Sequence, residues 1–335
     1  MKKYILLLAI AGLISSCYKL DQYPHDQLSS ATFWQTEVHA RQGMMSVYNI
    51  MQNDNVFGAY FWQDNLGEIG YDNVWHGGPI IKGTYNDRTA IIQAKWQYTY
   101  EGIARANVVL QHIDDVQIPE ELKAQYKAEA KFMRALYYFH LLDFYGGVPL
   151  YDETTIISNE FMDMKKPRTT TEETRNFILA DLQEAINVLP VRWPQSEYGR
   201  ATRGSAVALR GKVKLYAKDY AGATTDFEQI VNDPNGVGYG YALYPDYAKL
   251  FTPEGDASTE MIFAIQNTGG TGTEYGMPFG LRLGSRSSYG SCWNTCMPTD
   301  VFADMYENAD GTKFNWDDHI PGFTTSRPIQ EETFK

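Results

Sequence analysis

Residues 119–147 read PEELKAQYKAEAKFMRALYYFHLLDFYGG, and their apolar pattern is that of one long, deeply buried helix. Pro119 and the two glutamates after it suit a first helical turn, where a missing N–H costs little and negative charge meets the positive end of the dipole. Gly146 and Gly147 suit the end of the helix. Large or apolar residues recur at steps of four and three along one side, which predicts a stripe that faces a core. The stripe is Leu122, Tyr126, Ala130, Met133, Tyr137, Leu141 and Phe144, widened in its second half by Phe132, Ala135, Leu136, Phe139 and Leu142.

The segments on both sides of this helix have the same periodicity. We expect helices over Ala31–Gln52, Thr89–Asp114, Thr170–Leu189, Arg203–Lys218 and Asp219–Asn232. The last two are separated by a tight turn and resemble a tetratricopeptide repeat in their small and aromatic positions, which are Gly211, Tyr220, Ala223 and Phe227, with Pro234 near the end. Because one repeat cannot bury its own faces, the preceding helices are its expected stacking partners.

The amino-acid composition of the chain changes after Asn235, where Gly, Tyr and Pro become frequent. Glu260–Gln266 reads as a short strand, and Pro298–Glu307 as a further helix. Between them, Asn267–Trp293 is a long segment rich in Gly, Ser and Tyr, and such loops are often functional. The predicted fold class is therefore mainly α, with a tetratricopeptide-like helical-repeat scaffold, a loop-rich subdomain and a few short strands.

Composition narrows the possible functions of the 335-residue chain. Its net charge of −12 argues against nucleic acid as a partner, because neutralising phosphates needs Lys and Arg. No His, Cys or carboxylate cluster has metal-ligand spacing, and no cofactor motif appears, so we expect neither a metal nor a cofactor. Cys292 and Cys296 are compatible with either a local disulfide or two partly buried thiols.

The N-terminus predicts export and lipid anchoring. Lys2 and Lys3 precede an apolar run, Tyr4–Leu13, that is too short to span a bilayer, which needs about 20 residues. The small residues after it lead directly into Cys17. This arrangement is typical of a bacterial lipoprotein signal, in which residues 1–16 are removed and the cysteine sulfur carries acyl chains that hold the protein to a membrane.

Several blocks, in this order along the chain, resemble the SusD/RagB family. They are Arg105–Leu110, Tyr126–Tyr138, Asp143–Leu150, Arg168–Glu173, Ile178–Leu182, Gly199–Thr202, Ala206–Val213, Tyr244–Phe251 and Glu260–Phe263. The resemblance extends over essentially all of the chain after the signal. It implies an outer-membrane lipoprotein, exposed at the cell surface, that captures glycans or in some branches peptides. Its implied partner is a TonB-dependent, SusC-like outer-membrane transporter that imports the cargo.

The resemblance also implies a domain organisation. Residues 1–16 are the signal peptide, 17–233 the helical region, and 234–335 the start of the loop-rich C-terminal region. Members of the family generally run well past this length, so we expect the chain to be a C-terminally truncated member. We therefore expect part of the ligand surface to be missing from it.

Two loop segments have the composition of a sugar site. A pyranose stacks its flat C–H face on an aromatic ring and offers hydroxyls to polar side chains. The first segment, Gly67–Pro79, follows an early helix, and in related proteins such a loop contributes to the ligand face; the second is Tyr275–Trp293. The candidates are Tyr71, Asp72, Asn73 and Trp75 in the first, and Arg286, Tyr289 and Trp293 in the second. Loop packing is the alternative role for Trp75 and Trp293.

Other conspicuous residues are expected to be structural. Glu129 and Arg134 lie among apolar neighbours, where paired charges fix helix packing. Trp34, Trp62 and Trp96 lie in or beside helical patterns and are expected in the core.

A non-catalytic glycan receptor is the favoured function. A peptide receptor, a protein–protein adaptor and a lipid-anchored glycoside hydrolase are the alternatives. No pair of carboxylates is singled out for hydrolysis, and no G-x-S-x-G nucleophile motif appears.

Overall fold

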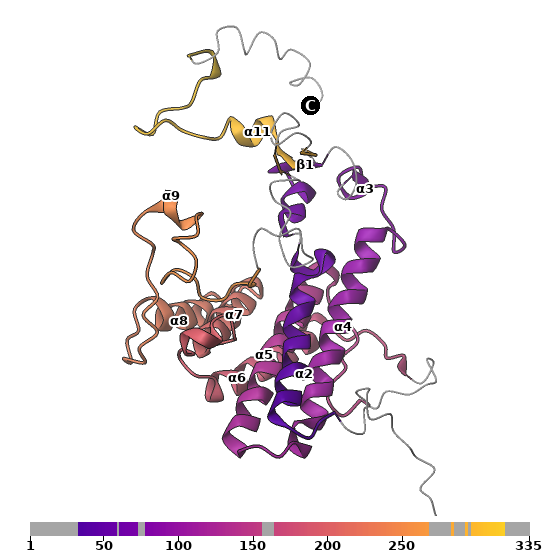
Figure 1. The fold of residues 1–335 in the computed structure, drawn as a ribbon. Coiled ribbons are helices and arrows are strands. Elements are labelled where there is room, and N and C mark those ends of the chain that lie inside the picture. The colour runs from indigo at the N-terminus through magenta and orange to yellow at the C-terminus, as the bar shows by residue number, and fades with distance from the viewer. Residues whose placement is uncertain are drawn as a thin grey trace, which may run out of the picture.

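The computed structural model is mainly helical, with long helices packed side by side and looser chain at one end (Figure 1). It describes residues 33–58, 60–72, 78–155, 164–267, 283–284, 292–293 and 296–318. The long helices are α2 (Glu37–Asn49), α4 (Ala90–His112), α5 (Glu120–Tyr145), α6 (Thr171–Val188), α7 (Arg203–Tyr216) and α8 (Tyr220–Val231). From α4 to α8 each helix packs on the next along the chain, and α2 packs on α4 and α5. This is the predicted helical-repeat architecture.

Helix α5 lies at the centre of the core. Nearly all of its predicted stripe is buried or partly buried; Phe144 is the exception, with 41% of its surface exposed. The helix ends at Gly146, whose φ of +73° is favourable only for glycine. Helices α4 and α5 approach closely because Gly102 faces the buried Tyr137 ring, where a Cβ would lie 2.6 Å from the ring carbon Cε2.

Helices α7 and α8 form the predicted repeat-like pair. Gly211 on α7 lies against the Phe227 ring on α8, and a Cβ there would lie 2.6 Å from the ring carbon Cε1. Ala223 is buried beside this contact, whereas Tyr220 is 62% exposed and takes no part in it. The small residue and the aromatic ring therefore fit together as the repeat pattern predicts.

Side chains at the helix starts define the boundaries that the sequence predicts only approximately. Thr170 and Glu173 form a capping box at α6, and Thr202 caps α7 together with Ser205. Thr36 caps α2, so this helix begins at Glu37 rather than near Ala31. The end of α2 continues as a 3₁₀ turn, η1 (Ile50–Gln52).

Buried charges tie the central helices together, as predicted for Arg134 and Glu129. The Arg134 guanidinium, 2% exposed, donates to both carboxylate oxygens of Asp181 on α6 at 2.7 and 2.8 Å, and also to Asn107 on α4. Although burial alone lowers the pKa of Arg134, its bonds to Asp181 hold that pKa above the ordinary value. Fully buried Glu129 accepts from Arg200 and from the Tyr48 hydroxyl. Burial nevertheless raises the pKa of Glu129.

The tryptophans predicted in the core are placed there where the structure describes them. Trp34 lies against Gly43 and stacks on His112 with ring centroids 5.5 Å apart. Trp96 is partly buried against the core and meets Tyr145 edge to face at 5.1 Å. The side chain of Trp62 lies outside the described residues.

The loop-rich part differs from its predicted elements in two places. Glu260–Gln266 is described throughout but forms no strand; Phe263 and Ile265 pack on the helical core instead, with Phe263 edge to face on Phe132 at 5.1 Å. The helix expected over Pro298–Glu307 is only the single turn α11 (Asp300–Ala303), because Thr299 caps it and Pro298 belongs to a strand.

Short elements connect the scaffold to its loop-rich end. After η1 come a π-turn, η2 (Asp54–Gly58), a 3₁₀ segment, η3 (Tyr60–Leu66), and strand β1 (Gly70–Asp72). The remaining short elements are α3 (Gly78–Ile81), η4 (Ile113–Asp115), η6 (Gln195–Glu197), α9 (Tyr247–Leu250), β2 (Cys296–Pro298) and η8 (Trp316–Asp318). None of the helices in the described part of the chain combines the length and apolar character needed to span a bilayer.

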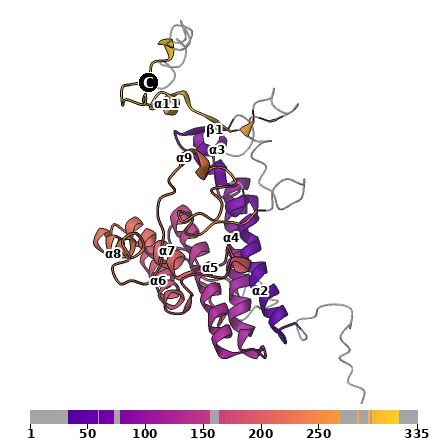
Figure 2. The same ribbon diagram turned by 60° about the vertical axis from the view of Figure 1, so that its left-hand side comes forward.

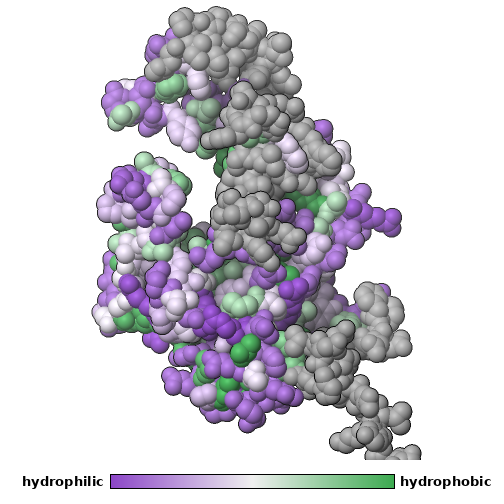
Figure 3. All heavy atoms as spheres, in the orientation of Figure 1, coloured by the Kyte–Doolittle hydropathy of each residue, from purple (hydrophilic) through white to green (hydrophobic). Residues whose placement is uncertain are grey.

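Two views show where these elements lie. Strand β1 and helix α11 lie beyond one end of the α2–α4 pair, and α7 and α8 flank the other helices (Figures 1 and 2). The face in Figure 3 is mostly hydrophilic, and it is open between the lobe that carries α9 and the lobe that carries α11. The predicted signal peptide and Cys17 lie outside the described residues.

Candidate functional site

The first of the two predicted loop segments pairs, in a two-stranded antiparallel sheet, with a strand that begins just after the second segment. Strand β1 lies in the first segment, and β2 begins three residues after Trp293, where the second ends. Tyr71 pairs with Met297, and the flanking pairs are Gly70 with Pro298 and Asp72 with Cys296. The chain therefore brings together two stretches that are more than 200 residues apart.

The structure describes the side chains of two predicted ligand-binding residues near this junction, and both are exposed. Tyr71 on β1 and Trp293 just before β2 each have 49% of their surface exposed. Tyr71 lies on a paired strand and Trp293 on the chain before one, and an exposed aromatic ring at either place is suited to stacking on the flat face of a sugar. Asp72 belongs to β1 through its backbone. The other four, Asn73, Trp75, Arg286 and Tyr289, lie outside the described residues.

Asn65 stabilises the β1–β2 junction through its side chain, and no sequence pattern indicated this residue. Its side chain is 2% exposed, and its amide Nδ2 donates to the Cys296 sulfur at 2.9 Å. Its Oδ1 lies 2.4 Å from where a Cβ on Gly70 would stand, so glycine is needed there. Thr299 adds a bond from its backbone N–H to the Ile69 carbonyl at 2.9 Å, and its hydroxyl donates to the Glu68 carbonyl.

The two cysteines near the junction are thiols in the structure rather than a disulfide. Cys292 is buried, and Cys296 is half-buried and receives the bond from Asn65. Of the two alternatives that the sequence left open, the structure therefore has the pair of thiols.

A buried lysine anchors the segment that leads from the scaffold to the junction. Lys95 on α4, 8% exposed, donates from Nζ to the Val56 carbonyl in η2 at 2.7 Å. Its ammonium also lies over the rings of Phe57 and Phe144, 5.4 and 4.9 Å from their centroids. Burial lowers the pKa of Lys95 to about 8, partly opposed by the charge of Asp143.

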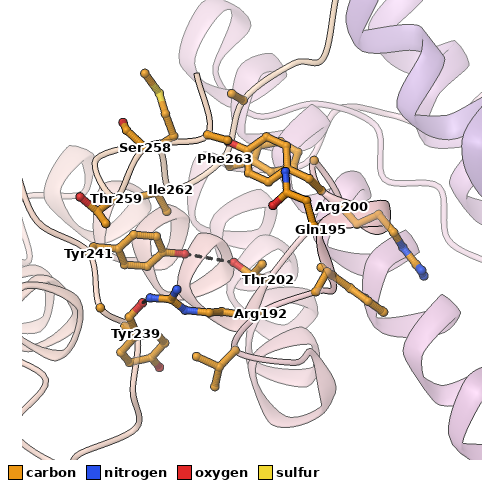
Figure 4. A pocket seen from close by; sticks show the side chains of 18 residues that line it. Arg192, Gln195, Arg200, Thr202, Tyr239, Tyr241, Ser258, Thr259, Ile262 and Phe263 are labelled. Carbon is orange, nitrogen blue, oxygen red and sulfur yellow. Dashed lines mark hydrogen bonds between the residues drawn. The ribbon is translucent and has the colours of Figure 1, made fainter. Parts of the chain in front are cut away.

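A second concave site, which the sequence reading missed, lies between loops on the α7 side of the molecule (Figure 4). It is a cavity of about 190 Å³ lined by residues from 191–202, 239–241 and 257–264. Five aromatic and six polar residues contribute to its wall: Trp193, Tyr198, Tyr239, Tyr241, Phe263, Arg192, Gln195, Arg200, Thr202, Ser258 and Thr259. The Trp-Pro-Gln and Gly-Tyr-Gly-Tyr stretches were its only signal in the sequence, and their convergence depends on the fold.

The wall of this cavity is held by hydrogen bonds. Arg192 donates from Nη2 to the Tyr239 carbonyl at 2.9 Å, and the Tyr241 hydroxyl lies 3.3 Å from the Thr202 hydroxyl. Trp193 donates to the Ala201 carbonyl at 2.7 Å, and the Arg200 guanidinium lies 3.7 Å from the Trp193 ring centroid. The cavity is thus built from polar groups and rings together, the composition of a small-molecule site.

Metal chemistry has no support in the described part of the chain. Among those residues, no group of three or more His, Cys, Asp or Glu side chains lies close enough to hold a metal ion.

The fold and the loops together define the class of protein. Packed helices form a repeat scaffold, and the paired strands and exposed rings lie on connections at its end. The chain belongs to the SusD-like family, as its motifs indicated: residues 19–215 match the family model described as "Starch-binding associating with outer membrane".

Curated relatives extend the match beyond the family model. A SusD-like protein of Formosa agariphila, P25, is 27% identical over 281 residues, which are 76% of this chain and 50% of that protein. The starch-binding protein SusD of Bacteroides thetaiotaomicron is 28% identical over 193 residues, 55% of this chain and 33% of that protein. The chain spans about half the length of the curated relatives that it matches most extensively.

Solved structures have the same fold. A SusD-like carbohydrate-binding protein of Bacteroides fragilis superposes with a TM-score of 0.74 at 25% identity, covering 85% of this chain and 56% of its own. A laminarin-binding SusD-like protein superposes with a TM-score of 0.70 at 27% identity, covering 80% of this chain and 63% of its own.

Proposed function

We propose that the protein is a non-catalytic glycan receptor of the outer membrane, and that it captures its ligand at the β1–β2 junction. The observation that carries the proposal is the strand pairing that brings Tyr71 close to the segment of Trp293, because each ring is about half exposed. The family's starch-binding description and the laminarin-binding relative support a polysaccharide as the ligand.

The rest of the proposal concerns how the receptor works in the cell. Acyl chains on Cys17 hold it to the membrane, and a SusC-like TonB-dependent transporter receives the captured glycan. The helical scaffold is consistent with this role. Buried ion pairs fix its helices, and these helices hold the loops that carry the aromatic side chains.

The test is a panel of polysaccharides, with starch and laminarin included, run against the purified protein. Each polymer is scored for retention of the protein in an affinity gel and for shortening of its chains. Retention by one or more polymers without shortening supports a receptor, whereas shortening would make the protein a hydrolase. Binding of peptides in place of every glycan would identify the peptide-receptor alternative.

Variants then locate the site. Tyr71→Ala and Trp293→Ala should each weaken retention about tenfold, because a stacked aromatic ring contributes about 1 kcal/mol or more. Tyr220→Ala is the matched control, because Tyr220 is a similarly exposed tyrosine on α8. Equal retention by all three variants would remove the β1–β2 junction from the ligand site.

A further inference from the structure

We infer that the cavity beside α7 is a second binding site, for a single sugar unit that carries a carboxylate, such as a uronate residue. This inference rests on the proposed function only in taking the ligand to be a sugar. The site is separate from the β1–β2 junction, because residues 191–202, 239–241 and 257–264 form its wall and none of them belongs to that sheet.

The arrangement of the wall suits a ring with hydroxyl groups. Figure 4 shows Tyr241, Thr202 and Arg192 on one side of the pocket and Gln195 and Phe263 across from them. Tyr241 and Thr202 offer hydroxyls that can both donate and accept, and Gln195 offers an amide. Rings of tyrosine and phenylalanine supply the flat apolar contact that a pyranose requires.

Positive charge at the cavity selects an acidic sugar over a neutral one. Arg192 gives one hydrogen bond to the Tyr239 carbonyl and has no ion pair with any described carboxylate. Other arginines of the scaffold are neutralised: Arg134 by Asp181, Arg200 by Glu129 and Arg210 by Asp226. Arg168 and Arg203 likewise donate to backbone carbonyls, so the distinguishing feature of Arg192 is its place in the cavity wall.

Charges of both signs surround the cavity, since Asp256 acts on the Tyr198 hydroxyl and Asp233 on that of Tyr239. Arg203 lies close enough to Tyr239 for its charge to act on that hydroxyl, and it donates to the Leu189 carbonyl rather than to an acid. Asp233 accepts from the backbone N–H groups of Val237 and Gly238, and Glu260 from that of Tyr244. Since a guanidinium and a carboxylate form strong, paired hydrogen bonds, Arg192 is the residue that distinguishes an acidic from a neutral sugar.

The experiment compares methyl glucuronide with methyl glucoside by ligand-observed NMR titration of the purified protein. The two sugars differ only at C6, which is a carboxylate in the glucuronide and a hydroxymethyl group in the glucoside, so we expect the glucuronide to bind at least fivefold more tightly. Arg192→Leu should remove this difference, whereas Arg88→Leu should preserve it. Arg88 is an exposed arginine on the loop before α4, and its loss changes the net charge equally.

The outcomes also separate this site from the proposed function. Arg192→Leu should leave retention by neutral polysaccharides unchanged, and Trp293→Ala should leave methyl glucuronide binding unchanged. Equal binding of both methyl sugars, or of neither, would overturn the inference even if the polysaccharide panel succeeds. Loss of polysaccharide retention in Arg192→Leu would overturn it too, because the cavity would then belong to the main glycan site.

Discussion

Lys95 is a buried cation without an ion pair among the described residues, and its position makes the stability of the protein depend on pH. Its pKa is about 8 in the folded protein and near 10.5 when the chain is unfolded. Between these values the unfolded chain binds more protons, so the free energy of unfolding rises as the pH rises. His140 beside it stays neutral, because burial holds its pKa well below the ordinary value.

Replacing this lysine should remove that dependence. Between pH 7.5 and 9.5 the free energy of unfolding of the natural protein should gain about 2 kcal/mol relative to Lys95→Met. Chemical denaturation at a series of pH values measures the difference, and tyrosines common to both proteins cancel. A constant difference across this range would mean that Lys95 stays fully charged in the folded state.

At the same scale, residue type indicated only part of the candidate site. Aromatic side chains beside glycines indicated the segment that contains β1 and the segment that precedes β2, and Tyr71 and Trp293 in these segments are exposed. Asn65 could not be found in this way, because its role is a hydrogen bond to the Cys296 sulfur, 231 positions further along the chain. The roles of Trp75 and the other undescribed candidates remain predictions.

Among the helices, the strongest single link is the one between α5 and α6. Arg134 is almost fully buried, and Asp181 supplies two of its hydrogen bonds, while Glu153 and Asn107 supply the rest. Removing one partner of a buried ion pair leaves a charge that neither water nor protein compensates. This link therefore matters more to the scaffold than the ion pairs on its surface.

Asp181→Asn should accordingly lower the free energy of unfolding by about 3 kcal/mol, the lower end of the usual range because Glu153 remains. Asp114→Asn is the matched control, since Asp114 pairs with Lys127 at the surface, and its loss should cost less than about 1 kcal/mol. Urea denaturation of both variants measures the two values. Similar losses in both would show that the buried network adds no stability beyond an exposed pair.

Elements with strong periodicity and caps could be predicted from the sequence, and weak ones could not. The stripe of α5 and the Thr170–Glu173 capping box identify their helices almost to the residue. Glu260–Gln266 has a strand-like composition, yet Phe263 and Ile265 are partly buried by packing on the helical core, so no partner strand is needed. The actual strands, β1 and β2, are three residues each, too short to have a detectable period.

For the whole molecule, the proposed attachment to the membrane depends on the Cys17 sulfur. If the Cys17 sulfur carries the acyl chains, Cys17→Ala should move the protein from the membrane fraction to the soluble fraction. Fractionation of cells that express either form measures this, and Ser16→Ala is the control because it retains the thiol. Persistence of the alanine variant in the membrane fraction would contradict the lipoprotein signal.

The β1–β2 junction pairs an early strand of the chain with a late one. The residues that stabilise this pairing should therefore affect ligand binding without affecting the helical scaffold. Asn65 is buried beside the sheet and exposes only 2% of its surface, so it has almost no area for contact with a ligand. Asn65→Ala removes the bond to the Cys296 sulfur and loosens the pairing of Tyr71 with Met297. A lost hydrogen bond of this kind costs about 1 kcal/mol.

We therefore expect Asn65→Ala to weaken glycan retention about fivefold, with the thermal midpoint changed by only a few degrees. Asn49→Ala is the control, because Asn49 makes one exposed hydrogen bond to Gln52 at the end of α2, away from the sheet. Affinity gels and thermal unfolding of both variants provide the comparison. Normal retention by Asn65→Ala, with faster amide exchange in β1, would show that the loops bind the glycan without the strand pairing, whereas a parallel loss of retention and global stability would make Asn65 part of the scaffold.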